Sequence, residues 1–250
     1  MAHSPASKAV ERDGVTDEVA VELPLEIRLN GESVAVTMRT PGHDFELAAG
    51  FLFGEGIVDA PPEVGLADDL AANVVEVRAD GAVAPSARRF YTTSSCGICG
   101  KGALEEVEAI APRVEGGPTI ERDLLASLPD RLRQPAFERT GGLHATGLFD
   151  AAGDLLTVRE DVGRHNAMDK VVGEALLGGR LPLGDGILCV SGRLAFELVQ
   201  KAVRAGAPIL VGVGAPTSLA VELADDRGLT LAGFARGGRV NVYTHPRRVN

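Results

Sequence analysis

The sequence predicts an α/β fold built on a mixed sheet with helices on both faces. Short apolar segments alternate with amphipathic ones along the C-terminal third: residues 187–190, 208–213 and 229–234 are apolar, and 194–205 and 217–225 have helical spacing. Strands that are buried on both faces typically form such continuous apolar runs, so the sheet should be parallel at least in part. A second observation is Asn30-Gly31 between two segments with period-2 alternation, which predicts a hairpin.

The N-terminal half predicts a smaller α+β part. Residues 1–20 are interpreted as a flexible tail, and strands around Leu25 to Leu29 and Val34 to Met38 form the predicted hairpin. Helical spacing predicts helices at 44–53 and 102–111, and a short strand is expected at 74–77.

The C-terminal half predicts the larger domain. Residues 112–142 are rich in Pro, Gly and Arg and mark the best candidate boundary. The predicted domains are therefore a tail at 1–20, a smaller part with a CxxC loop at 21–134, and an α/β domain at 135–250. The remaining elements expected in that half are strands at 143–149, 155–158 and 239–243 and a helix at 166–177.

Composition limits the possible classes of protein. The 250 residues contain 25 Lys and Arg against 35 Asp and Glu, a net charge of −10, which argues against a general nucleic-acid binder. No apolar stretch is long enough to span a membrane, and the polar start of the chain does not resemble a secretory signal. The odd count of 3 cysteines argues against a disulfide framework and points to a reducing, cytoplasmic location.

Basic residues concentrate in two windows that contain no acid. Arg88, Arg89 and Lys101 lie between Asp80 and Glu105, and a second window runs from residue 227 to residue 250. Such windows in an acidic protein are typical of local anion binding, although chance clustering on a solvated face gives the same pattern.

The pair Cys96 and Cys99 lies in the first basic window. It could be half of a zinc site, a redox dithiol, a carrier of sulfur as a persulfide, or two idle loop residues. Zinc needs four ligands, Cys189 belongs to an apolar strand, and the histidines show no paired metal-ligand spacing. Three nearby glycines indicate a mobile loop, and nearby cations lower a thiol pKa, so the residues favour a carrier that uses a thiolate.

Polar groups that follow predicted strands form a second set of candidates. Arg164 and His165 lie between a strand and a helix, and Arg193 follows an apolar strand directly. A third loop consists of Phe234, Ala235, Arg236, Gly237, Gly238 and Arg239. Ligands bind at the carboxyl ends of strands in open α/β sheets, so these loops together predict a nucleotide-like or multiply phosphorylated ligand. The alternative for the first pair is a capping and ion-pair network, in which Asp161 could be the cap.

Several long motifs, in order along the chain, resemble those of one family. They are Arg39-Thr40-Pro41-Gly42, Gly50-Phe51-Leu52-Phe53-Gly54-Glu55-Gly56, Ser94-Ser95-Cys96-Gly97-Ile98-Cys99-Gly100-Lys101, Thr140-Gly141-Gly142-Leu143-His144, the segment from Asp161 to Lys170, Ser191-Gly192-Arg193 and the Phe234 to Arg239 loop. With these motifs the chain resembles the FdhD family of formate dehydrogenase accessory sulfurtransferases from about Glu22 to Val249.

The resemblance implies a specific activity. Members accept sulfur from a cysteine desulfurase as a persulfide on the CxxC loop. They pass it to the molybdenum (or tungsten) bis-guanine-dinucleotide pterin cofactor, Mo-bis(molybdopterin guanine dinucleotide), which is bound as a client and then inserted into formate dehydrogenase. By this resemblance Cys96 is the carrier, Cys99 is the relay cysteine, and the Phe234 to Arg239 loop contacts the guanine nucleotide. It also implies a homodimer and a larger domain with a cytidine deaminase-like fold.

Two other functions remain as alternatives. One is a cofactor-binding chaperone whose cysteines carry no sulfur. The other is a zinc hydrolase of deaminase type, which needs a His/Cys-x-Glu element and a Pro-Cys-x-x-Cys. Ala145 and Thr146 follow His144 with no Glu, and the CxxC precedes His144 without a Pro. We therefore expect no permanently bound metal.

Overall fold

A computed structural model describes residues 6–67, 73–82 and 112–250. The chain divides into two compact units: unit 1 comprises Met1–Gly100, Gln134–His144 and Glu160–Gly179, and unit 2 comprises Lys101–Arg133, Ala145–Arg159 and Arg180–Asn250. These compact units differ from the predicted division at 134/135, because segments from both sides of it enter each unit. Local composition marks where loops lie, but it does not reveal which distant segments pack together.

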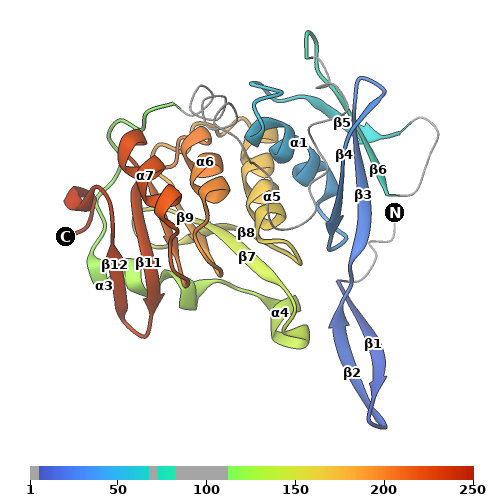
Figure 1. Cartoon of the computed structure of the whole chain (residues 1–250), viewed down its shortest axis with the longest axis horizontal. Helices are drawn as coiled ribbons and strands as arrows, with labels where there is room; N and C mark the ends of the chain where they lie inside the picture. Colours follow the sequence, from blue (N-terminus) through green and yellow to red (C-terminus); the bar gives the residue numbers. More distant parts are fainter. Residues whose placement is uncertain (1–5, 68–72, 83–111) are drawn as a thin grey trace. The chain divides into compact units, whose positions relative to one another are not determined.

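Unit 1 begins with a two-stranded hairpin where a flexible tail was expected (Figure 1). Strand β1 (Ser7–Arg12) pairs antiparallel with β2 (Val15–Ala20) in continuous register. Asp13 and Gly14 both have positive φ, 52° and 78°, as a two-residue type I′ turn requires. The tail prediction is therefore wrong. Most of both strands lies exposed, so the sequence lacks the apolar alternation that would have signalled them.

A four-stranded sheet follows in unit 1, with the order β4-β3-β6-β5. The strands are β3 (Leu23–Leu29), β4 (Glu32–Arg39), β5 (Glu63–Leu66) and β6 (Val74–Arg78). Asn30 and Gly31 form the turn between β3 and β4 with φ of 51° and 86°, which confirms the predicted hairpin. Strand β3 also pairs with β6 in parallel, so this sheet is mixed.

Two helices of unit 1 cross with their backbones in contact. They are α1 (Asp44–Gly54) and α5 (Arg164–Leu177). A Cβ added to Gly50 would overlap the backbone of Asp169, and one added to Gly173 would overlap the backbone of Glu46. The third helix, α4 (Pro135–Thr140), ends at Gly141 with φ 65°, so this glycine closes a helix.

Unit 2 contains a six-stranded mixed sheet with the order β12-β11-β10-β9-β7-β8. Its strands are β7 (His144–Phe149), β8 (Leu155–Asp161), β9 (Ile187–Val190), β10 (Ile209–Gly212), β11 (Thr230–Arg236) and β12 (Arg239–Val242). Strands β9, β10 and β11 are parallel, whereas β7 pairs antiparallel with β9 and β12 pairs antiparallel with β11. The predicted mixed sheet is confirmed.

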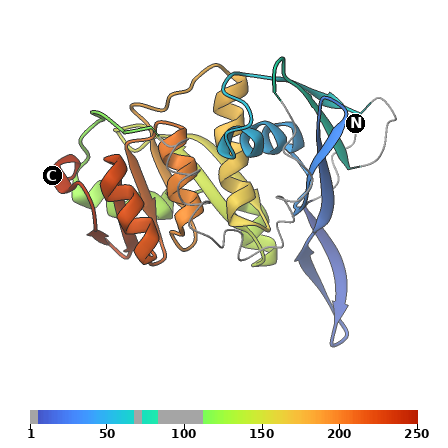
Figure 2. The same cartoon turned by 45° about the horizontal axis from the view of Figure 1, so that its top comes forward.

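Helices cover both faces of that sheet (Figures 1 and 2). Helices α6 (Phe196–Arg204) and α7 (Ser218–Arg227) lie on one face, and α3 (Arg122–Ser127) lies on the other and continues into η1 (Leu128–Arg131). Leu125 and Leu128 pack there with Ile187, Cys189 and Ile209 in one buried cluster. The region 112–142, expected to mark a domain boundary, therefore supplies part of a core.

The C-terminus of unit 2 forms a short helix, η2 (Pro246–Arg248). Among the described ranges, no helix is long and apolar enough to cross a membrane.

Candidate functional site

The predicted sulfur-carrying residues lie outside the described residues. Cys96, Cys99 and the cations predicted around them belong to residues 83–111, as does the helix expected at 102–111. Cys189 is described, and it is fully buried in β9. Burial, with a smaller contribution from Asp130, raises the pKa of its thiol well above the ordinary range. Cys189 is therefore a neutral, buried side chain of the core, as its apolar strand predicted.

At the carboxyl ends of the parallel strands, the loops after β9 and β10 are hydrogen-bonded to each other, and the second of them is hydrogen-bonded to the end of β11. After β10, the amide of Gly214 donates to the carbonyl oxygen of Gly192, which follows β9, at 3.0 Å. The amide of Phe234 in β11 donates to the carbonyl oxygen of Gly214 at 3.1 Å. These bonds place Arg193 and the Phe234 to Arg239 loop at one edge of one sheet, where open α/β sheets bind ligands.

Small residues allow these loops to approach closely. A Cβ on Gly214 would lie 2.8 Å from the Cα of Arg193 and 2.8 Å from the oxygen of Gly192, so a larger residue does not fit. The hydroxyl of Ser191 accepts a hydrogen bond from the amide of Ala145 at 2.9 Å. Ser191 therefore holds the start of β7 in place. Within the motif Ser191-Gly192-Arg193, Arg193 is then the residue whose side chain can bind a ligand.

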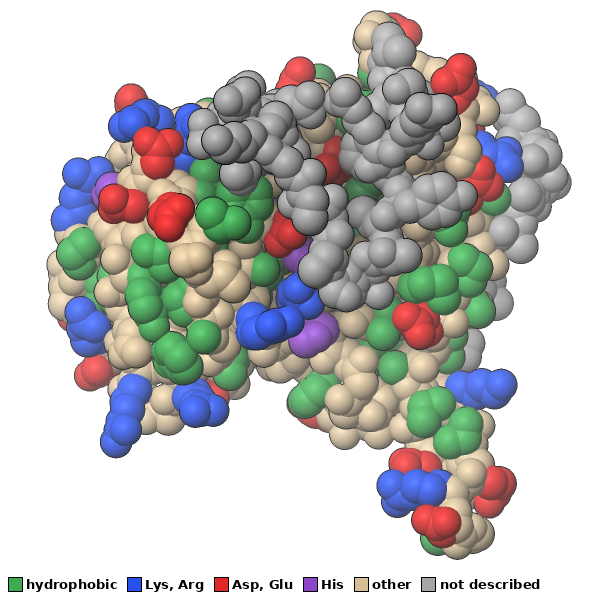
Figure 3. Space-filling model, viewed as in Figure 1, with side chains coloured by type: hydrophobic (Ala, Val, Ile, Leu, Met, Phe, Trp, Pro, Cys, Tyr) green, Lys and Arg blue, Asp and Glu red, His purple; other side chains and the backbone are tan. Residues whose placement is uncertain are grey.

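Three arginines at this carboxyl edge have no countercharge among the described residues. Arg193, Arg236 and Arg239 are exposed, and none of them forms an ion pair with a described residue. Arg236 pairs directly with Arg239 across the turn formed by Gly237 and Gly238, whose φ values are 56° and 72°. Like charges at directly opposed positions destabilise a sheet, and an anion bound between them would remove that repulsion. Figure 3 shows Lys and Arg side chains at the lower end of this unit, where β11 and β12 turn.

Apolar side chains are also exposed at the same edge. Phe234 is 39% exposed and Tyr243, just after β12, is 40% exposed. Ala235 lies between exposed neighbours, but it is fully buried in the core cluster. Of the predicted loop, Ala235 can therefore offer a ligand only its backbone. Tyr243 was not predicted as a site residue, because it lies beyond the loop, just after the next strand.

The other predicted binding residues, Arg164 and His165, lie in unit 1 at the start of α5. Asp161 fixes the turn before them: Oδ1 accepts the amide of Gly163 at 2.8 Å and the side-chain amide of Asn166 at 3.0 Å. The N-cap residue of α5 is Gly163, so Asp161 forms a turn just before the helix and does not occupy the cap position. The prediction that Asp161 caps the helix is therefore wrong, whereas the predicted ion pairing is present, between Asp161 and Lys170.

A buried ion pair lies beneath this turn. The ammonium group of Lys170 lies 2.7 Å from Oδ2 of Asp161, and the two side chains are 1% and 0% exposed. The same ammonium donates to the carbonyl oxygen of Thr40 at 2.9 Å, and the amide of Thr40 donates to Oδ2 of Asp161 at 3.1 Å. Sequence reasoning missed the contact between Thr40 and Asp161, since no local pattern links residues 121 positions apart.

The hydrogen bonds and the ion pair of Asp161 leave the first turn of α5 able to bind an anion. That turn contains no acidic residue, and Nε of Arg164 is buried without a hydrogen-bond partner among the described residues. Unsatisfied amides at a helix N-terminus favour negative charge, and a nearby guanidinium adds to that preference.

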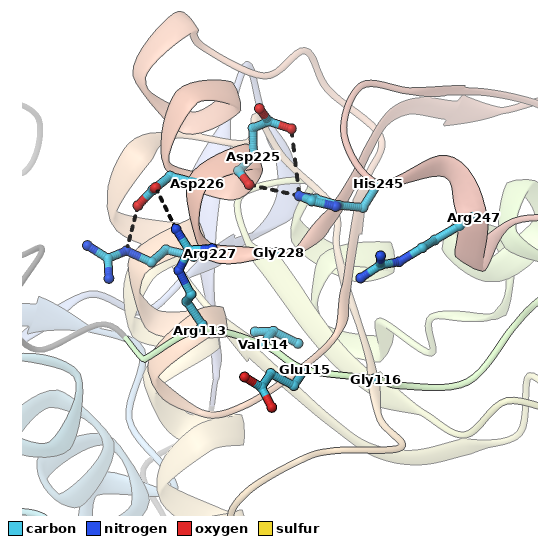
Figure 4. Close-up of a pocket in the computed structure, with 10 residues that line it drawn as sticks. All are labelled: Arg113, Val114, Glu115, Gly116, Asp225, Asp226, Arg227, Gly228, His245 and Arg247. Carbon is cyan, nitrogen blue, oxygen red and sulfur yellow. Dashed lines mark hydrogen bonds and ion pairs between the residues drawn. The ribbon is translucent and has the colours of Figure 1, made fainter.

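A cavity of about 370 Å³ lies in unit 2 at the amino ends of the strands (Figure 4). Its lining residues are Arg113, Val114, Glu115, Gly116, Asp225, Asp226, Arg227, Gly228, His245 and Arg247. Asp226 lies 3.3 Å from Arg113 and 3.1 Å from Arg227 in ion pairs, and a ring nitrogen of His245 lies 2.8 Å from the backbone oxygen of Asp225. The acidic and basic side chains that line the cavity balance one another in charge. The cavity therefore lacks the uncompensated positive charge of the carboxyl edge.

The structure shows no cluster of potential metal-binding side chains in the part of the chain that it describes. No group of three or more His, Cys, Asp or Glu side chains within those ranges is placed to hold a metal ion.

Comparison with known proteins assigns the chain to a family. The sequence profile of the FdhD/NarQ family matches residues 20–250. The chain belongs to the FdhD/NarQ family. This FdhD/NarQ chain is 53% identical to the sulfur carrier protein FdhD of Streptomyces avermitilis, over 95% of this chain and 92% of that protein. It is 46% identical to the sulfur carrier protein FdhD of Sulfolobus acidocaldarius, over 94% and 92% of the two chains.

A solved structure supports the same family fold. The crystal structure of a protein from Desulfotalea psychrophila, described as a formate dehydrogenase accessory protein, superposes with a TM-score of 0.76 at 29% identity and covers 99% of both chains. The mixed α/β fold of this FdhD/NarQ chain is thus shared with that relative, whereas a specific likeness to cytidine deaminase remains a prediction.

Proposed function

We propose that this FdhD/NarQ chain is a sulfur carrier that serves the maturation of formate dehydrogenase. The observation that carries the proposal is the match of residues 20–250 to a family whose relatives, about half identical over nearly their whole length, are named sulfur carriers. The Cys96-Gly97-Ile98-Cys99 motif lies within the matched range. Cys96 would hold the sulfur as a persulfide, and Cys99 would act as the relay.

Loading needs only a thiol exchange. The thiolate of Cys96 attacks the terminal sulfur of a persulfide on a cysteine desulfurase. The S–S bond of the donor breaks, its cysteine leaves as a thiolate, and a new S–S bond forms on Cys96 without net oxidation. The basic residues predicted around Cys96 would favour its thiolate form.

The acceptor would be the molybdenum or tungsten bis-guanine-dinucleotide pterin, bound as a client. In unit 2, Arg193, Arg236 and Arg239 offer uncompensated charge for its phosphates, and the exposed rings offer surface for its base. In unit 1, the open N-terminus of α5 with Arg164 and His165 suits a phosphate. We further propose that the chain works as a homodimer.

The decisive experiment is peptide mass spectrometry after incubation with an active cysteine desulfurase and cysteine. We expect the Cys96 peptide to gain the mass of one sulfur atom, and we expect Cys96→Ala to lose that gain while keeping the melting temperature of the parent. The peptide of buried Cys189 is the internal control and should stay unmodified.

Two outcomes decide between carrier and chaperone. Sulfur on Cys96, together with loss of formate dehydrogenase maturation in Cys96→Ala, supports the carrier. If the active desulfurase leaves both loop cysteines unmodified while the cofactor nucleotide still binds, the chain is a cofactor-binding chaperone without sulfur carriage.

A further inference from the structure

Arg248 is a buried arginine that forms no ion pair in the part of the chain that the structure describes. The residue is 3% exposed, and its Nη2 atom is buried without a hydrogen-bond partner in the same ranges. Burial, with a smaller contribution from Arg247, lowers the pKa of Arg248 below its ordinary value. A guanidinium that has lost its hydration without gaining a countercharge is costly, and a missing anion is one explanation for it.

The guanidinium of Arg248 lies directly behind two walls of the cavity shown in Figure 4. Its Nε donates to the carbonyl oxygen of Gly116 at 2.7 Å, and its Nη1 donates to the carbonyl oxygen of Gly228 at 2.8 Å. Both glycines line the cavity. The charge of Arg248 is therefore separated from the cavity only by backbone, and it adds to the charges of the lining side chains, which balance without it.

Two of the carboxylates that line the cavity already have partners. Asp226 is shared by two guanidinium groups, those of Arg113 at 3.3 Å and Arg227 at 3.1 Å. Oδ1 of Asp225 lies 3.6 Å from a ring nitrogen of His245. These two carboxylates therefore do not compensate a further cation.

Arg247, in contrast, is an uncommitted cation of the cavity. It is exposed and forms no ion pair with any described residue, and Figure 4 shows its side chain extending into the cavity. The third lining carboxylate, Glu115, is exposed and directed away from Arg247 in that view. Since Arg247 also lies close enough to Arg248 for their like charges to repel, an anion beside Arg247 would relieve both.

The C-terminal end of α7 borders the same cavity, and by itself it would repel an anion. Its last carbonyl groups already accept hydrogen bonds, however. The carbonyl oxygen of Arg227 accepts the amide of Val114 at 2.8 Å, and that of Gly228 accepts the guanidinium of Arg248. These donors offset the negative end of the helix, so that it does not oppose a negative ligand.

We propose that this cavity is a binding site for a small oxyanion, a phosphate or sulfate group, whose oxygens accept hydrogen bonds from Arg247 and whose charge compensates the buried Arg248. A guanidinium suits such a ligand because its planar N–H groups match two oxygens at once. The cavity lies at the amino ends of the strands in unit 2, whereas the proposed nucleotide site lies at their carboxyl ends. The inference therefore goes beyond the proposed function and does not depend on it.

Histidine NMR gives a readout that is specific to this cavity. The chain contains 5 His, of which His245 lines the cavity and His165 lies at the start of α5, where the proposed function places a phosphate. The ring signals of the intact chain are followed during a titration with sodium sulfate at constant pH, and sodium chloride of equal ionic strength is the control for screening. The two signals are assigned by their loss in His245→Gln and His165→Gln.

We expect the His245 signal to shift saturably with sulfate and to stay in place with chloride. In Arg247→Ala the sulfate concentration at the midpoint should rise about tenfold, because a charge-assisted hydrogen bond is lost. Arg133→Ala is the matched control: Arg133 is exposed in the same unit but does not line the cavity, so the midpoint should equal that of the parent. Both variants should keep the melting temperature of the parent. Arg248 is left unchanged, because its removal would also release Gly116 and Gly228.

The results that overturn the proposal differ from those that bear on the proposed function. If sulfate shifts the His165 signal and leaves the His245 signal in place, the cavity binds no oxyanion, while the phosphate site of α5 stands. If Arg247→Ala and Arg133→Ala give the same midpoint, Arg247 does not hold the anion and the proposal fails. If only the His245 signal shifts, with the expected weakening in Arg247→Ala, the cavity site stands and the phosphate site of α5 fails.

Discussion

A few residues hold the start of α5 in place, and Lys170 is the buried cation among them. Its buried ammonium satisfies the carboxylate of Asp161 and the carbonyl oxygen of Thr40. Asp161 in turn fixes the amide of Gly163, directly before Arg164 and His165. The geometry of a proposed phosphate site therefore depends on a charge pair that no ligand would touch.

Removing one partner of the pair Asp161 and Lys170 should destabilise the folded protein. Lys170→Met leaves the carboxylate of Asp161 buried and uncompensated, so we expect a loss of about 3–5 kcal/mol in the free energy of unfolding, measured by urea denaturation. The double variant Asp161→Asn with Lys170→Met leaves no buried charge and should cost less than the single one. A double variant less stable than Lys170→Met would contradict this account.

At the scale of elements, two glycines determine how α1 and α5 pack. Gly50 and Gly173 each lie against the backbone of the other helix, so the helices cross without side chains between them. From the sequence, residues 44–53 predict a helix, and the Gly50-Phe51-Leu52-Phe53-Gly54-Glu55-Gly56 motif carries part of the family resemblance. The structure adds that its first glycine is a packing contact.

Gly173→Ala should destabilise unit 1 strongly. The added methyl group would overlap the carbonyl oxygen of Glu46, and backbone cannot rotate away as a side chain can, so we expect a loss of roughly 3 kcal/mol or more. Thermal denaturation followed by circular dichroism measures it. Gly65→Ala is the matched control, because nothing lies within 4 Å of a Cβ there, and its change should stay within about 0.5 kcal/mol. Equal melting temperatures for the two variants would refute the close crossing.

At the scale of the whole molecule, each unit draws on distant parts of the chain. Unit 1 needs α5, whose Lys170 and Gly173 complete contacts with Thr40 and α1. Unit 2 needs residues before 134, since Leu125 and Leu128 belong to its core cluster. Neither unit is a continuous stretch of sequence.

Fragments cut at the boundary that the sequence suggested should therefore fail to fold. We expect fragments 1–134 and 135–250, produced separately, to lack a cooperative thermal transition, because each loses buried apolar contacts that the other fragment supplies. Calorimetry of the two fragments beside the intact chain tests this. A cooperative transition in either fragment alone would show that its core is complete without the other.

Local patterns in the sequence were enough to predict much of the fold. The hairpin at Asn30-Gly31, helices α1, α5, α6 and α7, and the strands of the parallel sheet were all predicted, since each depends on turn chemistry or apolar periodicity within a few residues. The Asp13-Gly14 hairpin carried the same turn signal, but its exposed strands lacked the periodicity. Strand β5 and helices α3 and α4 were missed because they are short and lie in segments rich in loop residues.

For the candidate site, the sequence by itself determined which residues have the chemistry. The CxxC pair, the arginines after the strands and the glycine turn at Gly237-Gly238 were all identified from residue type and order. Only the tertiary structure decided that Gly192, Gly214 and Phe234 meet at one edge, that Ala235 turns inwards, and that Thr40 and Lys170 hold Asp161. The physical reason is that hydrogen bonds and ion pairs act over a few ångströms in space, whatever the separation of their partners along the chain.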